Sequence, residues 1–173
     1  MRLAARWPER VESVALAAPA GISSARRIGA ALVTLAGVVR PARLLSTQAN
    51  RIANSTRLRR LVFGSLEVSN PDLLDERAVH GFLQGAALHT DVLGAGRALV
   101  ADDPFAYLDH VRCPLLVLFG GRDAQVPVED GIEYARRLGA PFRVIADCGH
   151  LLIGERPEIC ARVALGFSTG GVG

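Results

Sequence analysis

The chain has 173 residues, half of them hydrophobic and 21% charged, and its formal net charge is +3. This length supports one domain with a sizeable buried core, and this composition excludes a disordered chain. The twenty basic residues are all arginines, scattered without the interleaved aromatic residues of a nucleic-acid surface. We therefore expect a globular protein that binds no nucleic acid. Nucleic-acid binding, which would be marked by a steep salt dependence, is the last of the alternatives.

The N-terminal residues predict a helix followed by a buried strand. Residues 1–6 are typical of a helix that Trp7 and Pro8 end, and residues 11–18 are expected to form a buried strand. A second apolar run, residues 28–39, is too short to cross a bilayer core of about 30 Å. No targeting or membrane segment is predicted, and the three cysteines suggest reduced thiols. We expect a cytoplasmic protein without a membrane partner.

Residues 22–112 predict helices with little strand signal. The clearest start is at Asn70, which precedes a proline at the first helical position and an acid in the first turn. The expected helices span residues 23–39, 57–63 and 70–88, and another begins at Thr90.

Three of the four histidines also lie in this region, namely His80, His89 and His110. We expect surface or helix-capping roles for them. The sequence contains no set of ligands at metal-binding spacing, so we expect no metal and no cofactor.

The stretch 113–150 predicts a strand–helix–strand unit. Residues 115–119 are consecutive apolar residues, the pattern of a strand whose two faces are both covered. The helix opens at Pro127, where the missing N–H costs nothing, and ends at Gly139. The second strand spans residues 142–146. The connection should make the strands parallel, with a right-handed crossover in about 98% of such units.

Two helices in this part of the chain should each bury an apolar stripe. In the helix that begins at Pro127, the stripe is Ile132, Ala135 and Leu138. A final helix starts around residues 155–158, and its expected stripe is Ile159, Val163 and Phe167.

Asp123 and His150 follow the ends of the two strands of this unit. Parallel strands end at the same edge of a sheet, so we expect the two side chains within hydrogen-bond reach, or one small rotation from it. A carboxylate beside an imidazole fixes its tautomer and stabilises the imidazolium that forms when it takes a proton. The alternative is that both are ordinary loop residues, and Cys148 is a further alternative as a nucleophile.

Three stretches resemble the C-terminal part of an α/β-hydrolase. They are PLLVLFGGRDAQVP, which carries Asp123, DCGHLLIGERPE, which carries His150, and AARWPERVESVALAAP at residues 4–19. The resemblance implies an α/β fold: a partial α/β-hydrolase with about three parallel strands, flanking helices and a helical cap. Residues 1–21 and 113–173 would form the core and residues 22–112 the cap. It also implies catalytic roles for Asp123 and His150, and a place beside the pocket for Cys148.

The sequence departs from that family in lacking the first member of its catalytic triad. It contains no G-x-S-x-G motif, no H-G-G-G-type loop and none of the early strands that carry them. We therefore expect a truncated chain whose first strand has one unpaired edge. In the family's geometry, the nucleophile would lie about six residues before Met1, so an in-frame upstream motif is expected within about ten codons.

The expected function is that of a hydrolase acting on a small-molecule substrate. A serine nucleophile would suggest ester, lactone or carbon–carbon bond hydrolysis, and an aspartate would suggest epoxide or haloalkane hydrolysis. The alternatives are a non-catalytic fragment and an acyltransferase on the same fold. The residues leave open the substrate, the nucleophile and the oligomeric state, and the isolated chain should be inactive.

Overall fold

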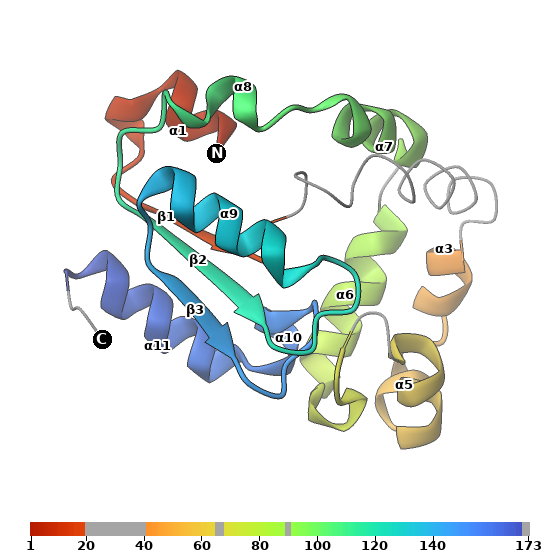
Figure 1. Cartoon of the computed structure of the whole chain (residues 1–173). Helices are drawn as coiled ribbons and strands as arrows, with labels where there is room; N and C mark the ends of the chain where they lie inside the picture. Colours follow the sequence, from red (N-terminus) through yellow and green to blue (C-terminus); the bar gives the residue numbers. More distant parts are fainter. Residues whose placement is uncertain (20–40, 65–67, 89–90, 171–173) are drawn as a thin grey trace.

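The computed structural model describes residues 1–19, 41–64, 68–88 and 91–170 (Figure 1). Three strands form one parallel sheet in the order β1-β2-β3, with β1 at Val14–Ala17, β2 at Leu115–Gly120 and β3 at Phe142–Ile145. The register pairs Val14 with Leu115 and Val117 with Phe142. The predicted α/β class and the parallel strand–helix–strand unit are confirmed.

Strand β1 lies at one edge of the sheet and pairs with β2 alone among the described residues. It is shorter than the predicted span of residues 11–18. Before it, helix α1 (Arg2–Arg6) and the 3-10 turn η1 (Pro8–Arg10) take up the chain, and the N–H of Val11 still bonds to that turn. After it, Ala18 has φ of 44°, a left-handed conformation that ends the strand.

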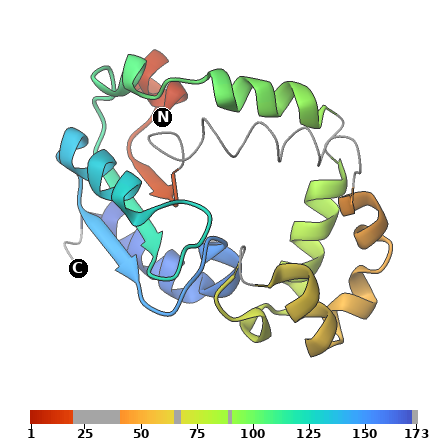
Figure 2. The same cartoon turned by 45° about the vertical axis from the view of Figure 1, so that its right-hand side comes forward.

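The central strand β2 is buried along its whole length, which explains its unbroken apolar sequence. Helix α9 (Val128–Leu138) covers one face of the sheet and helix α11 (Pro157–Ser168) lies on the other, as Figures 1 and 2 both show. Phe119 is fully buried, and its ring would lie 2.4 Å from a Cβ at position 131. Gly131 therefore allows α9 to approach the sheet closely.

Helix α9 has the predicted ends, and two residues of its predicted stripe face inward, since Ala135 is buried and Leu138 packs partly buried against the core, but the third does not. Pro127 caps it and Gly139, with φ of 59°, ends it in the left-handed conformation. Ile132, expected to face inward, is 50% exposed, whereas Tyr134 and Ala135 are buried. Gly131 packs against Phe119 in the sheet, so the next residue on the helix, Ile132, faces solvent.

The last helix also differs from its predicted stripe at one position. The chain forms a short helix α10 (Leu152–Glu155) and then α11, in which Pro157 occupies the first position. Ile159 is 40% exposed, and Cys160 is buried in its place. Val163 and Phe167 pack against the core as partly buried residues, as predicted.

A group of helices packs around a second apolar cluster, to the right of the sheet in Figure 1. It contains Phe63, Val79 and Leu83, each no more than 1% exposed. The helices are α3 (Pro41–Ser46), α4 (Ala49–Ala53), α5 (Thr56–Phe63) and α6 (Glu76–Leu88). Two further helices, α7 (Val92–Ala101) and α8 (Phe105–Leu108), lead back to β2.

The helix predicted from residue 70 to residue 88 is interrupted. Asn70 caps only a 3-10 turn, η2 (Pro71–Leu73), and α6 begins later, where Asp75 accepts a 2.6 Å hydrogen bond from the N–H of Ala78. Two strong capping side chains lie close together here, and the second one starts the long helix.

The helix expected over residues 23–39 and the side chain of His89 lie outside the described residues. Within the described ranges, we find no helix with the length and hydropathy to cross a membrane. The division into a core and a cap at residues 22–112 stays a prediction.

Candidate active site

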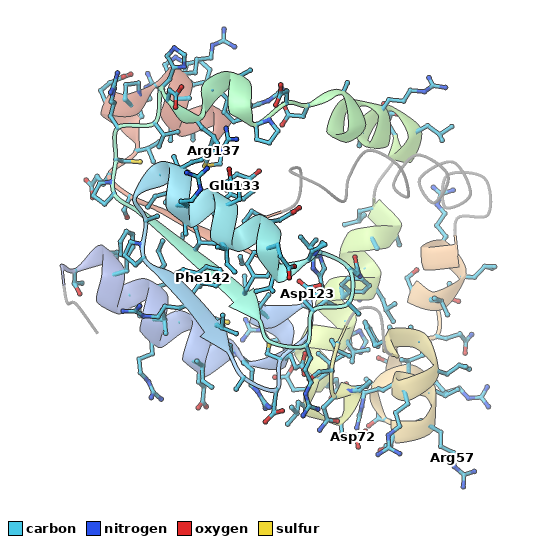
Figure 3. The ribbon with its side chains drawn as sticks, viewed as in Figure 1. Arg57, Asp72, Asp123, Glu133, Arg137 and Phe142 are labelled. Carbon is cyan, nitrogen blue, oxygen red and sulfur yellow. The ribbon has the colours of Figure 1, made fainter. Side chains whose placement is uncertain are left out.

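Asp123 and His150 contact each other directly. The Nδ1 atom of His150 lies 2.9 Å from Oδ2 of Asp123. Each residue follows the carboxyl end of its strand, and Figure 3 labels Asp123 in the loop beyond β2, at the end of the sheet nearer to α6. The predicted geometry is confirmed.

The surroundings of Asp123 determine which atom of the pair carries the proton. Its Oδ1 accepts hydrogen bonds from the N–H groups of Gln125, at 2.8 Å, and Val126, at 2.9 Å. Its side chain is 1% exposed, against 23% for His150. A carboxylate has acceptor oxygens only, so a hydrogen bond between it and an imidazole nitrogen has its hydrogen on the imidazole. Nδ1 of His150 therefore donates to Asp123, and Nε2 is left with a lone pair that can accept a proton.

Backbone contacts hold the two loops together. The N–H of Gly121 donates to the carbonyl of Ile145 and that of Arg122 to the carbonyl of Cys148, both at 2.9 Å. A Cβ on Gly120 would lie 2.2 Å from the carbonyl oxygen of Gly149, so only glycine fits where the loops cross.

Glu155 is a buried carboxylate beside this pair, which sequence reasoning missed. It is 2% exposed, and its Oε2 accepts a hydrogen bond of 2.7 Å from the N–H of Gly149. Three further donors surround it: the Oγ and N–H of Ser69, at 2.5 and 3.1 Å, and the N–H of Asn70, at 3.0 Å. The sequence signalled only a helix start near Pro157, because the donors of Ser69 and Asn70 lie more than 80 residues away.

The structure argues against Cys148 as a nucleophile. The residue is fully buried, and burial first, followed by the charge of Glu155, raises the pKa of its thiol to about 12. A thiol in this state is protonated near neutral pH, and the reactive form is the thiolate. Burial also raises the pKa of Cys160.

The remaining histidines of the described chain lie elsewhere. His80 is paired with Glu76 on α6, with Nε2 and Oε1 3.7 Å apart, and His110 is exposed after α8. In the described ranges, no three His, Cys, Asp or Glu residues lie together as metal ligands would.

Comparison with known proteins finds partial matches, and no family model matches the sequence. The chain is 43% identical over 52 residues to acylamino-acid-releasing enzyme 2 of Oryza sativa subsp. japonica, which is 28% of this chain and 7% of that protein. It is 41% identical over 71 residues to pimeloyl-[acyl-carrier protein] methyl ester esterase of Aromatoleum aromaticum, which is 40% of this chain and 28% of that protein. The matches therefore span less than a third of either relative.

Solved structures match nearly the whole chain. The enol-lactonase of Burkholderia xenovorans LB400 covers 96% of it with a TM-score of 0.61 at 24% identity, and the chain covers 60% of that structure. Other similar structures are likewise covered for 52–60% of their length. The chain thus corresponds to little more than half of each of these folds.

Proposed function

We propose that this chain, which has part of the α/β-hydrolase fold, supplies the histidine and the acid of a nucleophile–histidine–acid hydrolase. The observation that carries the proposal is the 2.9 Å contact between His150 Nδ1 and the buried carboxylate of Asp123. This contact orients the imidazole and leaves Nε2 as the basic atom.

In this proposal His150 acts as the general base. Nε2 takes the proton of the nucleophile while the nucleophile's oxygen attacks the electrophilic carbon of the substrate, and Asp123 stabilises the imidazolium that results. The imidazolium then returns its proton to the leaving group. Water, activated by the same Nε2, releases the second product and restores the enzyme.

The nucleophile belongs to a segment that this sequence does not contain, since it has no G-x-S-x-G motif. A serine there gives the scheme above. An aspartate would form an ester intermediate directly, and His150 would then act only on the water. The esterase and enol-lactonase named among the matches favour ester or lactone hydrolysis, and hence serine.

A cytoplasmic location is part of the same proposal. Its support is that Cys113, Cys148 and Cys160 are all free thiols, as expected in a reducing compartment.

The test is the hydrolysis of p-nitrophenyl acetate by two proteins: this 173-residue chain, and the product of the same gene with the in-frame codons before Met1 included. We expect the first to be no faster than its own His150→Ala variant, because it lacks a nucleophile and oxyanion donors. The second should turn over the ester and carry the nucleophile motif. Turnover by the short chain that depends on His150 would mean that an unrecognised nucleophile lies within it.

A further inference from the structure

A cavity of about 420 Å³ opens beside His150, between the loop that follows β3 and helix α6. Its volume lies within the range of small-molecule sites, roughly 300–1,000 Å³. Apart from the imidazole of His150, the described residues that line it are apolar side chains and glycines. The cavity therefore begins at the proposed general base and continues into an apolar space.

Helix α6 forms one wall of this cavity. Gly81 and Phe82 lie one turn beyond Ala78, so the three share a face of the helix. A Cβ at Gly81 would meet nothing within 4 Å, which shows that the glycine faces open space. Phe82 packs edge-on against the buried Phe63, with ring centroids 5.3 Å apart, and is itself 37% exposed.

We infer that the cavity receives an uncharged apolar portion of the substrate, such as an alkyl or aryl group next to the bond that reacts, and rejects a carboxylate at that position. The identity of the reacting bond rests on the proposed function. The preference of the cavity for an uncharged apolar group is inferred from its lining residues alone.

An anion in this cavity would lose its hydration without gaining a partner. No arginine is among the described residues that line the cavity. Two buried acids adjoin lining residues: Asp123, whose side chain is 1% exposed, is bonded to His150, and Glu155, 2% exposed, follows Gly154. Desolvation and repulsion therefore act together against a carboxylate. An alkyl chain gains from burial instead, by about fourfold in affinity per methylene.

The experiment measures ligand binding to this chain by amide NMR, with methyl hexanoate and monomethyl adipate as probes. The two esters have the same chain length, and the second ends in a carboxylate. We expect saturable shifts at Gly81, Phe82 and Gly154 with methyl hexanoate, and affinity about tenfold weaker or more with monomethyl adipate.

Two glycines of α6 provide a matched pair of variants. Both would carry a Cβ into open space, but only Gly81 lines the cavity and Gly85 does not. Gly81→Leu should weaken methyl hexanoate binding by about tenfold or more, and Gly85→Leu by less than about twofold. Phe82→Ala provides an independent variant, because it enlarges the cavity and should shift the preference toward longer esters.

Equal or tighter binding of monomethyl adipate would overturn the inference, as would equal effects of the two leucine variants or no saturable binding of methyl esters. If the proposed function alone is wrong, methyl hexanoate still binds as described, but His150→Ala leaves the turnover by the longer gene product unchanged.

Discussion

The carboxylate of Glu155 accepts a hydrogen bond of 2.7 Å from the backbone N–H of Gly149, the residue before His150. The same carboxylate accepts from the backbone N–H groups of Ser69 and Asn70, which lead into η2 and α6. A Cβ on Gly149 would lie 2.6 Å from the nitrogen of Ser69, so the two backbones touch. One buried anion thus joins the loop that carries His150 to the segment that precedes the cavity wall.

Replacing this anion should cost stability. In Glu155→Ala, the buried N–H of Gly149 and the partly buried N–H groups of Ser69 and Asn70 lose their acceptor, and an unpaired buried donor costs about 1–3 kcal/mol. We expect the free energy of unfolding to fall by about 3–5 kcal/mol in urea titration. The control Glu158→Ala, at an exposed position on α11, should change it by less than about 1 kcal/mol. Equal losses of unfolding free energy in the two variants would show that the hydrogen bonds of Glu155 do not stabilise the contact between these segments.

Asp123→Asn should move the proton on His150 from Nδ1 to Nε2. The N–H groups of Gln125 and Val126 would hold the amide oxygen, so the amide NH₂ would face Nδ1 and donate to it. Nitrogen-15 NMR of the imidazole reports the tautomer directly, in the isolated chain and without any activity. A variant that keeps the Nδ1–H form would contradict the proton assignment on which the mechanism rests.

Local sequence signals were sufficient for the strand–helix–strand unit. The apolar run of β2, the cap at Pro127 and the left-handed Gly139 each act within a few residues, and the structure has all three. The pairing of Asp123 with His150 then follows from parallel strand geometry, which needs no knowledge of side-chain packing.

Features that depend on contacts distant in sequence could not be predicted. Hydrophobicity alone places Ile132 and Ile159 on buried faces, but the rotation of a helix is set by what it packs against, as the contact of Gly131 with Phe119 shows. Glu155 is an acid near a helix start in the sequence. Only the fold brings the donors of Ser69 and Asn70 to it.

The three thiols should differ sharply in reactivity. Cys113 is partly exposed, whereas Cys148 and Cys160 are buried and have raised pKa values. A thiol with a pKa of about 12 is almost entirely protonated at about pH 8, so the buried Cys148 has little reactive thiolate. Iodoacetamide labelling followed by mass spectrometry should find Cys113 modified first, and all three modified in urea. Rapid labelling of Cys148 in the folded protein would reopen its role as a nucleophile.

Helix α9 should lose stability in acid through Glu133, which Figure 3 shows with Arg137 on that helix. Hydrogen bonds from Arg136, and then from Arg137, lower the pKa of Glu133 from 4.5 to about 2. The folded pKa is below the unfolded one, so the stabilisation is complete above pH 4.5 and is lost as the pH falls through about 2. Glu133→Gln should therefore be less stable than the parent near neutral pH, and the difference should shrink as the pH falls to about 2 and below. A difference in unfolding free energy that does not change with pH would exclude this cause.

The role of His150 is tested most directly by kcat/KM for p-nitrophenyl ester hydrolysis by the longer gene product and its His150→Ala variant. His110→Ala serves as the control, because His110 is exposed and lies after α8. We predict a loss of about a thousandfold or more in His150→Ala and less than about threefold in His110→Ala. A His150→Ala enzyme that keeps its full kcat/KM would contradict the account, and the contact with Asp123 would then be structural.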